Sequence, residues 1–372
     1  MLTRLRFRGK TGRRKRGIAL LIVLLVTAIL SVVVLDFAHS TRINLYIASN
    51  IADGLKAYYL AKSGLQVAQG ALLDDVQKKR KVDHLGEDWN SPLFSYIPLS
   101  DNETISVTVT DESSKFNLNQ LVGRSGTPRR FEGDWFRNLL ALQQIDDPDV
   151  VAAIIDWLDS DEEVLGGGGM EDQVYGYSSA QPQAYKSRNG RLLTLAELRL
   201  VKGVTDEIYR KLTETCTIFA DRKLNMNTID QRVLQAMIMA LDEKADAAGE
   251  AQKIVSWRVA GQEEAGKEEQ IFDGSGVVSE LEAAGVDRNL ARKINRKVGV
   301  TTRYFSVDAT AIVNSTIKNV TGVIQRSTRR ARLIYFRPGE RVTPMPATPS
   351  GEELEQLNAA AVAGGLNLGG GE

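Results

Sequence analysis

The stretch GIALLIVLLVTAILSVVVL occupies residues 17–35 and decides how the rest of the chain can fold. Residues 18–35 carry no charge, and only Thr27 and Ser31 interrupt their apolar character. As an α-helix they would span roughly 27 Å, close to the ~30 Å of hydrocarbon in a bilayer. The stretch therefore predicts a membrane-spanning helix on which the remaining chain is built.

A basic segment precedes the apolar stretch. Residues 1–16 are crowded with Arg and Lys and end in the run Arg13-Arg14-Lys15-Arg16. Positively charged flanks stay on the cytoplasmic side of a membrane, so everything after the apolar stretch is expected to cross it. The sequence thus predicts a single-pass protein with a cytoplasmic N-terminus.

Three interpretations fit a basic flank followed by an apolar helix. A secretory signal peptide would have a shorter apolar stretch and a small-residue cleavage site, which residues 36–40 fit poorly. A plain signal anchor requires only the flank and the helix. The third is the leader of prepilins and pseudopilins, which a peptidase on the cytoplasmic side cuts after a glycine, here between Gly17 and Ile18.

The region after the apolar stretch continues the same helix. No proline interrupts it before Pro92, and apolar residues recur at three- and four-residue spacings, as in an amphipathic helix. Each of Gly54, Gly64 and Gly70 weakens such a helix by up to about 1 kcal/mol relative to Ala. We nevertheless expect one helix over residues 18–80, and this continuity favours the prepilin leader.

Period-two alternation begins after residue 100. Ile105, Val107 and Val109 alternate with polar residues, which predicts a half-buried strand. Residues 111–114 are then predicted to turn, and residues 115–119 (Lys-Phe-Asn-Leu-Asn) to form the return strand.

The middle of the chain has short helical patterns, and strand patterns return near its end. The predicted fold class is α+β, with a long N-terminal helix plus an antiparallel sheet and a large inserted all-helical domain. The tail is rich in Pro, Gly and Ala and is predicted to be disordered. The expected organisation is a leader at 1–17, a spine helix at 18–80, the first part of an α/β domain at 81–130, the inserted helical domain at 131–300, return strands at 301–337 and the tail at 338–372.

The composition argues against several function classes. Lys plus Arg and Asp plus Glu each total 47, so the chain lacks the basic surplus of a typical nucleic-acid-binding protein. His39 and His84 are its only histidines, so a Ser-His-Asp triad or a His-rich zinc site would be hard to assemble. Cys216 is the only cysteine, which excludes an intramolecular disulfide.

One segment concentrates carboxylates. Asp156, Asp159 and Asp161 lie close together, and a glycine stretch then leads back to Glu171 and Asp172. Neighbouring carboxylates repel one another unless water or a cation lies between them, and calcium accepts oxygen ligands in irregular geometry. The spacing is not that of an EF-hand. The segment is therefore either a calcium site or a solvated acidic loop.

Two segments have the pattern of helix-hairpin-helix units. Residues 195–205 and 281–294 each place a glycine between two helical stretches. Nucleic-acid-binding hairpins use Gly-x-Gly so that backbone amides approach a phosphate, but Thr205 and Asp287 stand where the second glycine would be. Because Asp287 would repel phosphate, we interpret both segments as packing motifs.

These features together resemble the type II secretion minor pseudopilin K family, from residue 17 to about residue 336. The matching segments are residues 17–28, 55–65, 115–119, 156–175, 195–204 and 224–228 (Leu-Asn-Met-Asn-Thr), in the last of which Thr228 is expected to cap the next helix. Most pilins carry Glu at the fifth position after the cleaved glycine, whereas this family typically does not. In this chain the position is occupied by Ile22. That Glu neutralises the N-terminal amine of the subunit ahead, so its absence suits a filament tip.

The resemblance implies a pilin-like fold and an assembly role without catalysis. It implies removal of the leader after Gly17, methylation of Ile18 by prepilin peptidase, and calcium bound in the pilin-like domain. Its implied setting is the bacterial inner membrane, with the globular part in the periplasm. There the protein would form the tip of the type II secretion pseudopilus and support export of folded proteins. The implied partners are minor pseudopilins of the I and J types, the major pseudopilin, and the secretin or secreted substrates, but no nucleic acid.

Two other functions remain open from the residues. A membrane-anchored DNA-uptake receptor would use the two hairpin segments. A membrane-bound hydrolase would use the clustered carboxylates, although nothing in the sequence pairs them with a nucleophile.

Overall fold

The computed structural model describes residues 13–77, 82–91, 96–145, 147–161, 163–166, 185–259 and 270–339. Within these ranges the helices are α1 (Arg13–Gln77), α3 (Arg130–Leu142), α4 (Pro148–Leu158), α6 (Asp206–Thr215), α7 (Gln231–Leu241), α8 (Ala247–Val259), α9 (Val277–Ala283) and α10 (Arg288–Asn295). Short 3-10 helices are η1 (Asp88–Asn90), η2 (Glu112–Ser114), η3 (Leu118–Gln120) and η4 (Leu195–Leu200). Beyond Gly339 the predicted tail lies outside the described residues.

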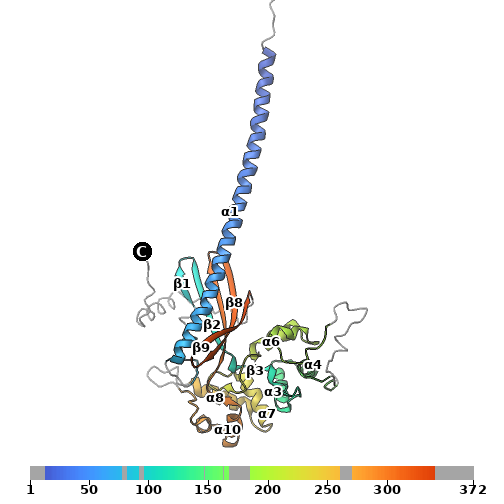
Figure 1. The fold of residues 1–372 in the computed structure, drawn as a ribbon, viewed down its shortest axis with the longest axis vertical. Helices are drawn as coiled ribbons and strands as arrows, with labels where there is room; N and C mark the ends of the chain where they lie inside the picture. The colour runs from blue at the N-terminus through green and yellow to red at the C-terminus, as the bar shows by residue number, and fades with distance from the viewer. Residues whose placement is uncertain are drawn as a thin grey trace, which may run out of the picture.

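Helix α1 is the longest element and extends far beyond the rest of the molecule (Figure 1). Its 65 residues correspond to about 98 Å at the usual rise per residue. The long helix is therefore confirmed, although it begins at Arg13, before the predicted start at Ile18, and passes through Gly17 without a break.

A five-stranded antiparallel sheet lies against the second half of α1 (Figure 1). Its strands, in spatial order, are β1 (Ile97–Ser100), β2 (Glu103–Asp111), β7 (Tyr304–Val313), β8 (Thr316–Ser327) and β9 (Arg330–Pro338). The sheet core includes Val107 and Val109 of β2, which confirms the predicted alternation there. The α1 side chains in this core recur at three- and four-residue spacings and are Ala57, Ala61, Leu65, Ala68 and Leu72.

The predicted return strand at residues 115–119 is wrong. Strand β2 pairs with β7 on one side and β1 on the other, and residues 112–114 form η2. Only β3 (Phe116–Asn117) is extended there, and it pairs in parallel with β4 (Cys216–Thr217). Phe116 and Leu118 are apolar enough for a strand, but their side chains are buried in the core of the helical domain. Alternation identifies a buried face but does not identify the partner strand.

A second hydrophobic core organises the helical domain. It gathers Trp135 and Phe136 of α3 with Ile154 of α4 and with Leu234 and Met237 of α7. The domain is not wholly helical, because β3 pairs with β4, and β5 (Leu224–Asn225) pairs in parallel with β6 (Val298–Gly299). The chain leaves the sheet after Asp111 and returns at Tyr304, so the domain is inserted between two adjacent strands, and the fold class is confirmed.

Gly64 sets how closely α1 approaches the sheet. A Cβ atom at this position would lie 2.9 Å from Ala309 Cβ and 3.0 Å from Val107 Cγ2. Both neighbours are short side chains fixed on strands, so neither can move aside easily. Gly70, on the same helix, is exposed and would have nothing within 4 Å of a Cβ atom.

The two glycines make a matched pair of substitutions in one helix. We expect Gly64→Ala to lower the free energy of unfolding by about 1–3 kcal/mol, because the added methyl overpacks the α1–sheet contact. Gly70→Ala should raise it by up to about 1 kcal/mol, since only helix propensity changes. Denaturant unfolding of the detergent-solubilised protein measures both, and a stabilising Gly64→Ala would contradict this packing.

Candidate functional site

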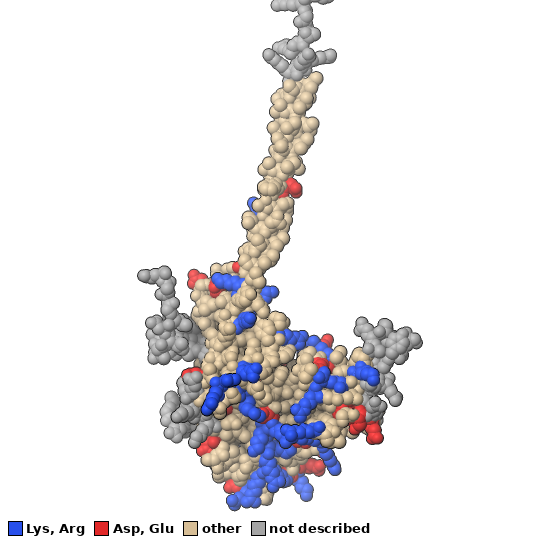
Figure 2. All heavy atoms as spheres, in the orientation of Figure 1, with Lys and Arg blue, Asp and Glu red and all other residues tan. Residues whose placement is uncertain are grey.

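The first half of α1 is an exposed apolar surface. Every residue from Ile18 to Ala52 is exposed, and Figure 2 shows this half of the helix as a column with very few charged side chains. An 18-residue window near the N-terminus has a mean hydropathy of 3.3, so the helix is long and apolar enough to cross a membrane. Apolar patches of this size mark contact with a membrane or another protein.

The predicted cleavage and tip positions lie on this column. Gly17 is inside α1, next to Ile18. Ile18 is 60% exposed and Ile22 is 55% exposed, so neither side chain is needed for the packing of the described chain. The side chains of Ile18 and Ile22 are therefore available for contact with a bilayer or a neighbouring helix.

The predicted metal residues divide into three groups. Asp156 and Asp159 are buried at the C-terminal end of α4, and both oxygens of Asp156 accept the backbone N–H of Leu165 at 3.2 and 3.1 Å. Asp161 is exposed, and its Oδ1 accepts the Glu163 N–H at 3.0 Å. Glu171 and Asp172 lie outside the described residues. Among the described residues, Asp156 and Asp159 are thus buried near the end of α4, whereas Asp161 is exposed.

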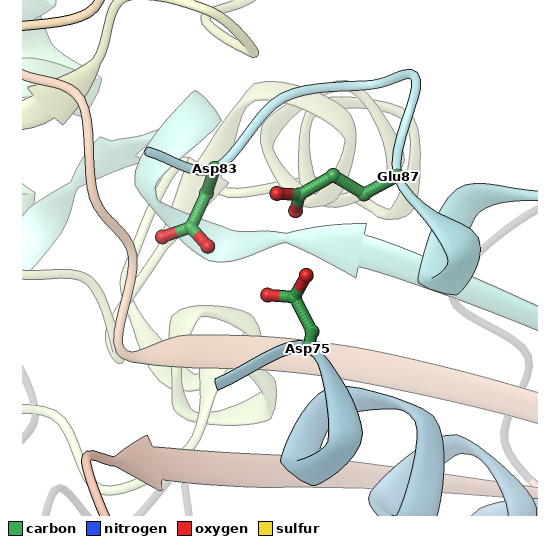
Figure 3. A group of neighbouring side chains, drawn as sticks. All are labelled: Asp75, Asp83 and Glu87. Atoms are coloured by element: carbon green, nitrogen blue, oxygen red, sulfur yellow. The ribbon is translucent and has the colours of Figure 1, made fainter. Parts of the chain in front are cut away.

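A different carboxylate cluster lies where α1 ends. Figure 3 shows Asp75, Asp83 and Glu87 pointing toward one another, and each offers an oxygen within 4.8 Å of the others. All three are buried, which raises the pKa of Glu87 to about 7, with the charges of Asp75 and Asp83 adding to the effect. Three facing carboxylates resemble a hard-cation site.

An arginine already supplies the positive charge of this cluster. Arg326 of β8 donates from Nη1 to Asp75 Oδ2 at 2.8 Å and from Nη2 to Asp83 Oδ1. The same Nη2 also donates to the Thr302 carbonyl at 3.0 Å. We infer that these carboxylates and Arg326 hold the end of α1 on the sheet. Sequence reasoning missed it because Arg326 is remote along the chain and no motif joins it to the three carboxylates.

Asp111 joins the sheet to the inserted domain. Its Oδ2 accepts hydrogen bonds from Asn225 at 2.9 Å, Thr228 at 2.5 Å and Thr302 at 2.6 Å, and Oδ1 accepts the Ser113 N–H at 2.6 Å. Burial raises the pKa of Asp111 to about 6. Thr228 therefore does not cap α7 as predicted.

The N-cap of α7 is Asp230, whose carboxylate accepts the N–H groups of Arg232 and Val233.

Glu112, the residue next to Asp111, completes the junction between the sheet and the inserted domain. Although burial opposes it, the ammonium of Lys115, at 2.8 Å, lowers the pKa of Glu112. Glu112 also accepts hydrogen bonds from Ser306 at 2.6 Å and from Thr217. Both carboxylates at the end of β2 are thus used to hold the domains together.

The two hairpin segments use their distinguishing residues as helix caps. Thr205 Oγ1 accepts the Ile208 N–H at the start of α6, and Asp287 Oδ1 accepts the Asn289 and Leu290 N–H groups at the start of α10. These are the backbone amides that a phosphate would need. The geometry therefore favours the packing interpretation over the DNA-receptor interpretation.

Known proteins with similar sequences are components of one secretion system. The family model of "Type II secretion system (T2SS), protein K" matches residues 114–221. Type II secretion system protein K of Pseudomonas aeruginosa is 31% identical over 239 residues, which cover 60% of this chain and 68% of that protein. The Klebsiella pneumoniae protein of the same name is 30% identical over 263 residues, covering 67% and 77% respectively.

A solved structure has the same fold. One chain of the crystal structure of the GspK-GspI-GspJ complex from the enterotoxigenic Escherichia coli Type 2 Secretion System aligns with a TM-score of 0.58 at 21% identity. The alignment covers 77% of this chain and 97% of that one. The relatives, the fold and the exposed N-terminal helix agree, and the chain belongs to the type II secretion system protein K family.

Proposed function

We propose that this chain forms the tip of the type II secretion pseudopilus and supports export of folded proteins across the outer membrane. The observation that carries the proposal is Ile22, an exposed apolar side chain on the unpacked half of α1. Subunits inside such a filament would need a carboxylate there to neutralise the amine of the subunit ahead. An unpaired carboxylate in an apolar setting costs several kcal/mol, so a subunit with nothing ahead of it favours an apolar residue.

The shape of the molecule supports an end position. The inserted domain lies at the end of the sheet away from the exposed part of α1 (Figure 1). A subunit of this kind can pack its apolar helix among other helices, while the inserted domain occupies the space that a following subunit would need. The role is assembly, with no reaction catalysed by this chain.

The proposed partners follow from this position. They are minor pseudopilins of the I and J types, as in the related Escherichia coli complex, together with the major pseudopilin. The chain would cross the inner membrane once, with a cytoplasmic N-terminus and a periplasmic globular part, before prepilin peptidase cuts after Gly17 and methylates Ile18. The inserted domain would face the secretin or secreted substrates.

Calcium binding by the acidic segment belongs to the same proposal. Asp156 and Asp159 are less than 2% exposed at the C-terminal end of α4, where the partial negative charge of the helix adds to their own. Oxygen donors in a negative potential suit a hard cation. Asp161, Glu171 and Asp172 would supply further oxygens from the following loop.

Leader cleavage is tested at Gly17. We expect the mature wild-type chain to begin at N-methylated Ile18, and Gly17→Ala to remain uncleaved because the peptidase needs the glycine. Intact-mass spectrometry of the membrane-purified protein measures both, with Gly12→Ala in the leader as the matched control. A Gly17→Ala chain that is processed and supports secretion would contradict the leader assignment.

The tip position is tested at Ile22. We expect Ile22→Glu to reduce secretion strongly, because a tip subunit would bury a carboxylate that no amine neutralises. Ile22→Val keeps an apolar side chain and should secrete normally. The measurement is the amount of a secreted enzyme in the medium of a deletion strain complemented with each variant. Normal secretion by Ile22→Glu would exclude this physical account of the tip.

Calcium binding is tested by thermal unfolding of the purified protein with and without calcium. At a hundredfold excess over its dissociation constant, calcium should stabilise the wild type by about 2.7 kcal/mol. Asp159→Asn should lose this shift, whereas Asp149→Asn, at the exposed start of α4, should keep it. An equal calcium shift in both variants would remove Asp159 from the site.

A further inference from the structure

A groove of about 890 Å³ lies between the end of the sheet and the helical domain. Its walls come from residues 117–129, 218–223 and 299–304 and from β9, with Arg191 on one side. We call it the basic groove, after its positively charged lining residues Arg124, Arg129, Arg191, Arg222, Lys223 and Arg303. In Figure 2, Lys and Arg side chains gather over the helical domain below the sheet.

The positive charge of the basic groove is largely uncompensated. Asp221 is the one carboxylate among the described residues of its lining, and it pairs with Arg303, whose Nε donates to Asp221 Oδ2 at 2.7 Å. Among the residues that the structure describes, the side chains of four others make no hydrogen bond or ion pair, namely Arg124, Arg191, Arg222 and Lys223. All four are exposed, in a chain whose formal net charge is zero. A cleft lined by one sign of charge attracts ligands of the other sign.

The walls of the groove are held in place by three amide side chains on one segment. Asn117 Nδ2 donates to the Ala220 carbonyl at 2.6 Å, and Gln120 Nε2 donates to the Asp221 carbonyl at 2.8 Å. Asn119 Oδ1 accepts the Leu192 N–H at 2.8 Å, next to Arg191. Residues 117–120, which overlap the predicted return strand at 115–119, therefore position the loops that carry Arg191, Arg222 and Lys223.

A hairpin-like loop positions Arg124 in the same way. The Gly123 N–H donates to the Thr127 carbonyl at 2.8 Å, and the Arg129 N–H donates to the Leu121 carbonyl at 2.7 Å. The basic side chains thus stand on backbone that is already fixed, which lowers the entropy cost of binding a ligand.

We propose that the basic groove binds an acidic peptide segment of a partner protein. Guanidinium groups pair with carboxylates through two parallel hydrogen bonds, and four exposed cations can meet successive Asp or Glu side chains. Ile334, which is exposed on β9, also lines the groove and offers apolar contact to the peptide between its charges. At Ile334 the register of β9 with β8 is interrupted, since Leu333 pairs with Ile324 and Tyr335 with Val323.

A nucleic acid fits the groove less well. A duplex is far wider than a pocket of this volume, and a single strand needs open aromatic faces on which bases can stack. The two aromatics in the lining, Phe219 and Tyr304, are both half-buried, and the ring centroid of Phe219 lies 5.7 Å from that of Tyr335. The chemistry therefore favours carboxylates on a peptide.

Peptide binding by the basic groove does not require the tip position. Peptide binding is a property of the helical domain and the sheet end, whereas the tip proposal rests on Ile22 and the exposed half of α1. If an experiment excludes peptide binding, the tip position can still be tested, and the reverse also holds, because peptide affinity and secretion are separate measurements.

The test measures binding of fluorescein-labelled hexaglutamate to the detergent-solubilised full chain by fluorescence anisotropy. We expect saturable binding that weakens with salt. The groove variant Arg124→Gln/Arg222→Gln should bind at least about tenfold more weakly, since it loses two carboxylate pairs. The matched control Arg292→Gln/Arg330→Gln removes the same charge at exposed positions outside the groove lining and should change affinity less than about twofold.

Each alternative outcome is decisive. Equal weakening in both double variants would overturn the groove, because affinity would then follow net charge alone. Hexaglutamine bound as tightly as hexaglutamate would overturn the role of the carboxylates. A thymidylate hexamer bound more tightly than hexaglutamate, with the same dependence on Arg124 and Arg222, would assign the groove to nucleic acid instead.

Discussion

The rest of the structure depends on the buried carboxylate of Asp111. The inserted domain is connected to the sheet at two points, after Asp111 and before Tyr304, and β2 and β7 bring them together. Asp111 accepts hydrogen bonds from Asn225 and Thr228 inside the domain and from Thr302 on the returning chain. A buried carboxylate without these partners would be costly, so the network favours the one arrangement that satisfies it. The two hydrophobic cores, one on each side of the junction, are thereby held in a defined relation.

Helix α1 serves two environments with one continuous backbone. Its second half packs small side chains such as Ala57 and Ala61 onto the sheet, and Gly64 allows the closest approach. Its first half has no partner among the described residues and exposes large apolar side chains, including Leu35 and Phe37 at 69% and 71%. This difference in burial separates the part of the helix that stabilises the monomer from the part available to a membrane or filament.

Local patterns in the sequence predicted the long helix, the strand at Ile105–Val109 and the α+β class, because each depends on periodicity within one segment. Long-range pairing was not predictable in this way. The return strand was misplaced because Phe116 and Leu118 alternate correctly yet are buried in a different core. The Asp75–Asp83–Arg326 cluster was missed for the same reason, since its members meet only in the folded chain. The acidic segment was recognised by composition, but burial of Asp156 and Asp159 could not be read from spacing.

The connection of the inserted domain to adjacent antiparallel strands has a mechanical consequence. A force that pulls the inserted domain away from α1 and the sheet acts on the end of β2 and the start of β7 at the same time. At this point Asp111 pairs with Phe305. Such a pull separates β2 from β7 starting at this end, one residue pair at a time. A force that slid the two strands past each other would instead load all their residue pairs together. Resistance at the first pair therefore comes from the side-chain bonds around Asp111 and Glu112. The hydrogen bonds at this junction therefore protect the sheet from opening whenever a load pulls on the inserted domain.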